Sequence, residues 1–365
     1  MAAFPYINIP SDAALPLSGN ENVLVAQDGI LHKTSVQSIA DLAGGSSEPV
    51  VIAGELFVST NGSDASGTGS LSAPLASIAA ALAAASASYS ATSYVRINIG
   101  PGDFTTPLSI TRARTSIVGA NVSPDDRTTK LGPVTVDCAS ATQKFQDTVA
   151  LSGLFMQSTI AQPALKITGT GLFTADVSNC YVTTTVAGQN AVLCDASNAG
   201  KPAVYLRSCV VTKQISASAD VVRFARGDAR LDSTRVFASV SGTGNGVSFE
   251  NNAVGLLDRV LVDISTTGAA LRVNLALSTA SLPVSVSNSA LTANASSSAC
   301  AYLANTDGPA ALIWQCILTK PLSGAGEFAI TGLSNGSTLT LLSGNLAFPV
   351  NSVINTVTRV GMTIV

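Results

Sequence analysis

The chain has 365 residues, of which 46% are hydrophobic and only 11% charged, and its formal net charge is −3. This balance provides no basic surface for nucleic acid, and no apolar run is long enough to span a membrane, so we expect neither nucleic-acid binding nor membrane insertion. The composition is typical of a β-rich protein whose surface carries hydroxyl and amide groups.

The first 48 residues differ in character from the rest. The N-terminus MAAFPYINIPSD has no basic stretch followed by an apolar one, so no secretory signal is expected. The phrase LPLSGNENVLVAQDGILHKTSVQSIADLAGG follows at 15–45. Thr34 or Ser35 is suited to cap a short helix over 36–43, which Gly44 would end.

This phrase resembles a short module found at the start of phage and virus structural proteins. The resemblance implies that residues 1–48 attach the protein to other virion proteins of a tail or capsid. The matching residues are Leu15, Leu17, Gly19, Glu21, Val23, Val25, Gln27, Gly29, Lys33, Thr34 and Ser35.

The stretch FVSTNGSDASGTGSLSAPLASIAAALAAA, at 57–85, reads as a strand, a loop and an alanine-rich helix. Pro74 is expected to start the helix, because its fixed φ suits the first helical position. An apolar stripe on this helix would cover the end of the structure that follows. Asp64 could bind a cation, but a turn before a cap is the favoured interpretation. We assign 49–93 to a linker and N-terminal cap.

A six-residue pattern recurs with a period of 25 to 30 residues: apolar, any, small polar, any, any, apolar. Each period holds at least two short strands separated by turns, without a convincing amphipathic helix. The copies are VSNCYV at 177–182, LRSCVV at 206–211, LDSTRV at 231–236, LLDRVL at 256–261, VSNSAL at 286–291 and IWQCIL at 313–318, with a weaker LSGLFM at 151–156.

A period of this length with short strands favours a parallel β-helix, in which equivalent residues stack about 4.8 Å apart. The first apolar position then forms one inward stack: Val177, Leu206, Leu231, Leu256, Val286 and Ile313. The last position forms a second stack: Val182, Val211, Val236, Leu261, Leu291 and Leu318. The polar third position marks a bend: Asn179, Ser208, Ser233, Asp258, Asn288 and Gln315.

The repeat resembles the right-handed, pectin-lyase-like parallel β-helix, and 57–85 resembles the segment that begins many such proteins. Together with the N-terminal module, this resembles a bacteriophage tailspike or virion spike. The resemblance implies a homotrimer made in the host cytoplasm, located on the virion tail or particle surface, and bound to a host-surface glycan. We expect the shaft over 94–335. A C-terminal cap over 336–365 is expected to trimerise, with a monomeric cap as the alternative.

Many tailspikes cleave polysaccharide, which requires two carboxylates on one face. The candidates are Asp232 and Asp258, on successive repeats, with Asp228 and Glu250 nearby. Arginines lie close to each of them in sequence, so ordinary ion pairs are favoured over catalysis. Aromatic residues are only 5% of the chain, few for a sugar groove. Trp314 is expected to serve packing or trimer contact.

Other motifs indicate no further chemistry. The six cysteines form no CxxC pair, so we expect buried thiols and no zinc. No cofactor is expected. The single histidine, His32, is remote from the repeats, Arg226-Gly227-Asp228 is interpreted as a chance tripeptide, and the glycines of 242–246 as a turn.

Three functions remain open. The favoured one is a virion spike that adsorbs to the host without catalytic activity. The alternatives are a polysaccharide-depolymerising tailspike, acting as a glycosidase or lyase on the same β-helix, and a capsid-decorating or cement protein.

Overall fold

The structure is a computed structural model of the whole chain, which divides into two compact units, Met1–Val51 and Ile52–Val365. In the first unit, β1 (Asn22–Gln27) and β2 (Ile30–Ser35) form an antiparallel hairpin. The predicted helix over 36–43 and the side chain of His32 lie outside what the structure describes. It describes 22–27, 30–35 and 52–364, except 197–201, 216, 217, 240, 252, 275–283, 296–298, 304–307, 315, 320–329, 332–336, 343, 347–356, 360 and 361.

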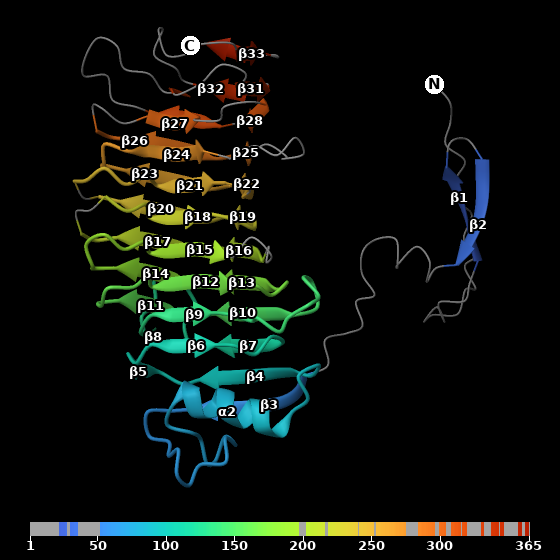
Figure 1. Cartoon of the computed structure of the whole chain (residues 1–365), viewed down its shortest axis with the longest axis vertical. Coiled ribbons are helices and arrows are strands. Elements are labelled where there is room, and N and C mark those ends of the chain that lie inside the picture. Colours follow the sequence, from blue (N-terminus) through green and yellow to red (C-terminus); the bar gives the residue numbers. More distant parts are fainter. Residues whose placement is uncertain are drawn as a thin grey trace. The chain divides into compact units, whose positions relative to one another are not determined.

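The second unit is a coil of three parallel sheets, whose strands lie in stacked layers in Figure 1. Sheet 1 consists of β3 (Ile52–Val58), β4 (Tyr94–Ile99), β7 (Thr115–Val118), β10 (Thr148–Ser152), β13 (Thr174–Ser178), β16 (Ala203–Arg207), β19 (Asp228–Asp232), β22 (Val254–Asp258), β25 (Val284–Ser287), β28 (Gly308–Trp314), β31 (Ser337–Leu342) and β33 (Val357–Arg359).

Sheet 2 consists of β5 (Gly102–Phe104), β8 (Thr129–Leu131), β11 (Phe155–Ser158), β14 (Tyr181–Thr184), β17 (Val210–Lys213), β20 (Arg235–Ala238), β23 (Leu261–Ile264), β26 (Ala290–Ala293) and β29 (Ile317–Thr319). Sheet 3 consists of β6 (Leu108–Ile110), β9 (Val134–Val136), β12 (Leu165–Gly169), β15 (Val192–Ala196), β18 (Val222–Phe224), β21 (Val247–Glu250), β24 (Ala269–Asn274), β27 (Ala299–Leu303) and β30 (Ile330–Thr331).

From β4 to β31 the chain visits the three sheets in turn, so a strand pairs in parallel with the third strand after it. One sequence repeat is therefore one turn of the coil. This arrangement confirms the predicted all-β fold of the right-handed parallel β-helix type.

The inward stacks follow the predicted pattern in every copy but one. Val177, Leu206 and Leu231 are in register and inaccessible to solvent. In the next coil, Leu257 and not Leu256 continues the stack, and Val262 rather than Leu261 continues the second. This copy of the repeat therefore begins one residue later than predicted. The stretch LLDRVLV contains two apolar pairs with the same spacing, Leu256 with Leu261 and Leu257 with Val262, and a one-residue shift exchanges the two faces of a strand.

A short turn joins sheets 1 and 2, and one residue of it takes a left-handed conformation in successive coils. Arg259, with φ of 55°, holds this place in its coil, so the predicted bend at Asp258 is wrong by the same single residue. The other turn residues with positive φ are Gly153, Asn179, Ser208, Ser233 and Asn288.

The N-terminal end of the coil is covered by α2 (Ile78–Ser88), which contacts β3, β4 and β6. The helix begins after Ser77, whose side chain accepts a hydrogen bond from the Ala80 amide, so Pro74 does not start it. Asp64 explains the difference, because its Oδ1 accepts hydrogen bonds from Ala76 N at 2.8 Å and Ser77 N at 2.9 Å. The buried residues of the helix are Ile78, Ala81, Leu82 and Ala85.

The C-terminal segment continues the coil at the strands that are described. β31 pairs in parallel with β28, and β33 with β31, while β32 (Gly344–Leu346) pairs in parallel with β34 (Met362–Ile364). Within the described residues, α2 is too short to cross a membrane and no longer apolar helix is found.

Candidate functional site

The four candidate carboxylates lie on two faces of the coil. Asp228 and Asp232 begin and end β19, and Asp258 ends β22, so these three belong to sheet 1. Glu250 ends β21 and belongs to sheet 3. Asp232 and Asp258 are partners on adjacent strands, so the structure brings this pair together and separates Glu250 from it.

One guanidinium joins Asp232 to Asp258. Arg259 Nη2 lies 2.6 Å from Asp232 Oδ1, and its Nε lies 3.4 Å from Asp258 Oδ2. Asp258 Oδ1 also accepts hydrogen bonds from Ser287 Oγ at 2.7 Å and Asn288 Nδ2 at 2.9 Å. The two carboxylates therefore share a cation from the turn between sheets 1 and 2.

These contacts keep Asp258 ionised. The hydrogen bonds from Asn288 and Ser287 lower the pKa of Asp258 below its ordinary value, although burial opposes them. The positive charges of Arg259 and Arg230 lower this pKa further. A general acid in glycoside hydrolysis needs the opposite shift, because it must carry a proton at neutral pH. Asp258 is therefore suited to an ion pair and poorly suited to donate a proton.

Asp228 is paired with a lysine from a distant part of the chain. Lys144 lies in the loop before β10, and its Nζ contacts Asp228 Oδ2 on β19. The tripeptide Arg226-Gly227-Asp228 thus has its carboxylate engaged, and Gly227 adopts a φ of 95° in the turn before β19. In the structure, Gly227 of this tripeptide forms a turn and Asp228 forms an ion pair within the chain.

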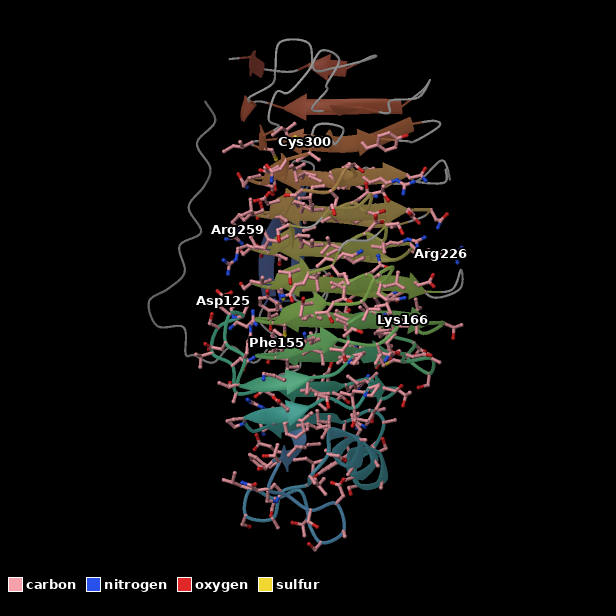
Figure 2. The ribbon with its side chains drawn as sticks, turned by 90° about the vertical axis from the view of Figure 1, so that its left-hand side faces the viewer. Asp125, Phe155, Lys166, Arg226, Arg259 and Cys300 are labelled. Atoms are coloured by element: carbon pink, nitrogen blue, oxygen red, sulfur yellow. The ribbon has the colours of Figure 1, made fainter. Side chains whose placement is uncertain are left out.

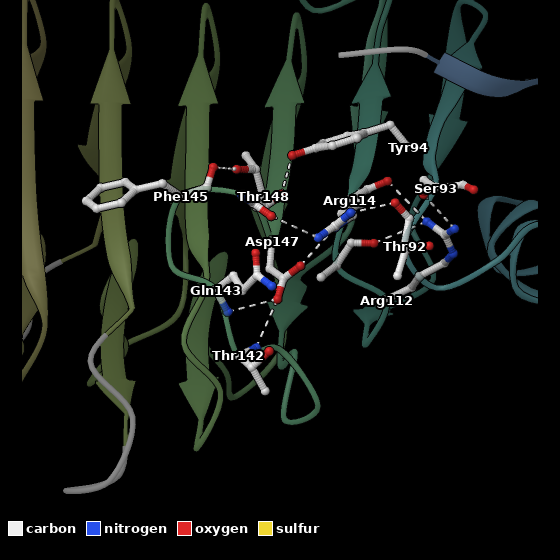
Figure 3. A network of polar contacts seen from close by, with 12 residues as sticks. Thr92, Ser93, Tyr94, Arg112, Arg114, Thr142, Gln143, Phe145, Asp147 and Thr148 are labelled. Carbon is white, nitrogen blue, oxygen red and sulfur yellow. Dashed lines mark hydrogen bonds and ion pairs between the residues drawn. The ribbon is translucent and has the colours of Figure 1, made fainter. Parts of the chain in front are cut away.

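The loop that carries Lys144 is fixed at its far end by a partly buried network centred on Asp147 (Figure 3). Arg114 Nε donates to Asp147 Oδ1 at 2.9 Å, and Arg114 Nη1 donates to the Thr92 carbonyl at 2.6 Å. Asp147 Oδ2 accepts from the backbone amides of Thr142 at 2.9 Å and Gln143 at 3.0 Å. Three of these four contacts hold backbone atoms and the fourth joins the two side chains, so the network is structural.

Glu250 lies between two arginines of sheet 3. Arg223 Nη2 and Nε donate to Glu250 Oε2 at 2.6 and 3.0 Å, and Arg272 Nη1 lies 3.6 Å from Oε1. The Glu250 side chain is 15% exposed, against 42% for Arg223 and 31% for Arg272. The carboxylate is thus the inner member of the cluster, with the two cations outside it.

Few aromatic rings are available beside these charges. Tyr205, half-buried on β16, is in register with Asp176 and Arg230 on sheet 1, and Phe145 in the preceding loop is 72% exposed. The side chain of Trp314 lies outside the described residues, so its predicted packing role stays a prediction.

The favoured ion pairs with arginine are present for Asp232, Asp258 and Glu250, but sequence reasoning missed Lys144 as the partner of Asp228 and a charge pattern on sheet 3. Six outward-facing residues on successive coils alternate in sign, in two neighbouring rows. The signal was present as one charged residue within or directly after each sheet 3 strand from β9 to β24, once per repeat. These residues are Asp137, Lys166, Asp195, Arg223, Glu250 and Arg272.

No group of three or more His, Cys, Asp or Glu side chains suited to a metal ion occurs among the described residues. Residues 242–246 form a turn, as predicted, in which the Gly242 carbonyl and the Asn245 amide and carbonyl groups bond to neighbouring coils.

Comparison with known proteins gives fold-level similarities. No protein-family model and no curated protein matches the chain. Pectin methylesterase PemA from Erwinia chrysanthemi aligns with 12% identity and a TM-score of 0.40, over 84% of this chain and 92% of its own. The pectin methylesterase from Aspergillus niger aligns with 15% identity and a TM-score of 0.38, over 80% and 86%.

ORF18 of Geobacillus virus E2 aligns with 10% identity and a TM-score of 0.33, over 90% of this chain and 69% of its own. At this level of similarity, none of these proteins transfers an activity or a substrate to this chain. The chemistry must therefore be argued from its own side chains. On both charged faces most of these side chains form ion pairs between neighbouring coils, and Lys144 pairs with Asp228 across several coils, an arrangement suited to hold a rigid surface and to bind a polar partner.

Proposed function

We propose that this protein is a structural spike of a bacteriophage virion, which adsorbs to a host-surface glycan without cleaving it. The observation that carries the proposal is the state of the candidate carboxylates. Asp228, Asp232, Asp258 and Glu250 each contact a lysine or arginine, so within the described residues none is arranged as a general acid. The coil thus offers long polar faces for binding rather than a pair of catalytic acids.

Two sequence features support a place on the virion. Residues 1–48 resemble the module that begins phage and virus structural proteins, and the coil that follows is a rigid shaft suited to project from a particle. We propose that the chain forms a homotrimer, attached by its N-terminal segment to tail or capsid proteins. Antibodies against 94–335 should label the surface of purified particles; particles that lack the protein would contradict this location.

Catalysis is tested directly. The full-length protein, incubated with capsular or lipopolysaccharide of the host, should bind cells and leave the polymer length unchanged in size-exclusion chromatography. Shorter fragments that disappear with Asp232→Asn or Asp258→Asn would establish a depolymerase instead. Failure to adsorb to host cells, with the protein still present on particles, would favour a decorating or cement role.

A further inference from the structure

One row of outward side chains on sheet 3 has an order that suits a linear polymer. Lys166, Leu193 and Arg223 are partners on β12, β15 and β18. Ser248, Arg272 and Tyr302 continue the row on β21, β24 and β27. Along the coil axis the row therefore runs cation, apolar, cation, hydroxyl, cation, aromatic, with one step of about 4.8 Å per coil.

The cations recur at every second coil, about 9.6 Å apart along the axis. An extended glycan advances by about the same length per disaccharide, so acidic groups on alternate sugars would lie between successive cations, at the levels of Leu193 and Ser248. Tyr302, which is 39% exposed, lies one step beyond Arg272 at the end of the row. Lys166 and Arg226 mark this edge of the coil in Figure 2, opposite Asp125 and Arg259.

A second observation at the centre of the row points to a ligand. The hydroxyl of Ser248 is fully buried and has no hydrogen-bond partner, although it lies directly between Arg223 and Arg272. Buried polar atoms without a partner are rare in folded proteins. A group that entered between the two guanidiniums would lie over this hydroxyl.

The position between the arginines is already taken by a carboxylate of the chain. Glu250 contacts Arg223 through two hydrogen bonds, but Arg272 only at 3.6 Å, so among the described residues most donors of Arg272 have no partner. Within the described residues, Lys166 has no ion-pair partner. The neighbouring row also carries Asp137 and Asp195, which offset the positive charge of the face. A polyanion would therefore be held by contacts with the individual cations of the row and not by a large net charge.

We propose that this row binds a linear glycan with a carboxylate on alternate sugars, and that Glu250 is an internal competitor for the central position. This inference rests on the proposed adsorption function and names its ligand class. The external carboxylate takes the place of Glu250 between Arg223 and Arg272 and accepts the hydroxyl hydrogen of Ser248. Glu250 then turns to solvent, where its charge is hydrated.

The test measures binding of the full-length protein to three immobilised polymers: hyaluronan, with a carboxylate on alternate sugars; alginate, with one on every sugar; and neutral dextran. We expect hyaluronan to bind best and dextran not at all. Arg223→Gln and Arg272→Gln should each weaken binding roughly tenfold, as expected for lost hydrogen bonds to a charged group. Glu250→Gln should strengthen it several-fold, because the competitor is removed.

Arg235→Gln is the matched control, since it removes the same charge from an exposed arginine on sheet 2. It should leave binding unchanged. Equal weakening by all three arginine variants, a loss of binding in Glu250→Gln, or equal binding of hyaluronan and dextran would each overturn the inference. If the wild-type protein adsorbs to host cells but one of these outcomes is found, only the glycan-binding inference fails. If the wild-type protein does not adsorb, both the inference and the proposed adsorption function fail.

Discussion

In the six coils from Gly153 to Asn288, the turn between sheets 1 and 2 contains one residue with positive φ. Glycine, asparagine and aspartate accept this conformation most readily, whereas other residues are strained in it. Asn179 and Asn288 meet the requirement, but Ser208, at φ of 52°, does not meet it well. The turn therefore limits which residues the third position of the repeat accepts.

Ser208→Asn should raise the free energy of unfolding by up to about 1 kcal/mol, and Ser208→Val should lower it by about 1–2 kcal/mol. Ser208 is exposed and its side chain makes no hydrogen bond that the described residues show, so backbone strain is the main difference. Urea denaturation of the three proteins measures the effect. Equal free energies of unfolding for the asparagine and valine variants would contradict a role of backbone strain at position 208.

The residue after this turn position has a role that the sequence did not reveal. This position is held in successive coils by Cys180, Cys209 and Thr234. Their side chains donate one hydrogen bond each to a carbonyl one coil away, which belongs to Leu151, Val177 and Leu206, respectively. The cysteines were predicted only as small buried residues. They are small and buried, but they also act as weak donors in the same place as a threonine hydroxyl.

Burial makes these thiols inert. It raises the pKa of Cys138, Cys194 and Cys209 to about 12, and that of Cys180 well above its ordinary value. Since the thiolate is the reactive form, the folded protein at pH 8 should react with Ellman's reagent far more slowly than the unfolded protein, which should release six equivalents. A fast reaction of several thiols in the folded protein would contradict the burial of these cysteines.

At the scale of elements, two loops run along the outside of the coil and join turns that are not neighbours. The loop over 120–128 contacts sheet 2, where Asp125 pairs with Arg235 at 3.1 Å. The loop over 138–147 contacts sheet 1, where Lys144 pairs with Asp228. A coil in which each turn touches only its neighbours thus gains two longer-range connections.

Asp147 gives the second loop a dependence on pH. Burial raises its pKa, but the amides of Thr142 and Gln143 and the guanidinium of Arg114 outweigh burial, so the net pKa lies below the ordinary value. The unfolded carboxyl titrates near 3.9, so this stabilisation is complete above about pH 4 and is lost as the pH falls through the lower folded pKa. The urea midpoint should therefore fall in acid.

The matched variant is Asp147→Asn, which lacks the ionised form at every pH. It should lower the stability at pH 7 by about 1–2 kcal/mol and should lose less stability than the wild type between pH 5 and pH 3. Parallel acid profiles for the two proteins would show that Asp147 does not contribute to the dependence.

In the first loop, stacking should matter more than the ion pair. The guanidinium of Arg127 lies 5.0 Å from the ring centroids of both Phe155 and Tyr181, which pack on the outer face of sheet 2. Exposed cation–π contacts are worth roughly 0.5–1 kcal/mol each, and exposed ion pairs about 0.2–1 kcal/mol. Arg127→Ala should therefore destabilise the protein more than Asp125→Ala, in denaturation followed by tyrosine fluorescence. The reverse order would contradict it.

At the scale of the whole molecule, the period alone predicts the coil, because each repeat makes the same contacts with its neighbours. Local ambiguity limits the register, as Leu256 and Leu257 show, since both satisfy the apolar pattern. The sequence favoured ion pairs between the candidate acids and nearby arginines, but it did not tell which cation pairs with which acid. Arg259 faces Asp232 across two strands, and Lys144 meets Asp228 through a loop, and both depend on register and turn geometry.

A coil has two ends, and each exposes strand edges and apolar interior unless it is covered. Here α2 covers the N-terminal end within the chain. We expect association of the C-terminal segments to cover the other, so light scattering should give three times the 36.7 kDa of one chain, about 110 kDa. A mass of 36.7 kDa would refute the trimer.

Deletion of 1–51 separates the two proposed roles of the chain. It removes one compact unit, Met1–Val51, and leaves the cap helix and the three sheets intact, so the thermal midpoint and the number of chains in the assembly should not change. The truncated protein should still adsorb to host cells but should no longer be incorporated into particles, because the attachment segment is missing. Immunoblots of purified particles measure incorporation, and normal incorporation of the truncated protein would show that the particle is contacted through the coil instead.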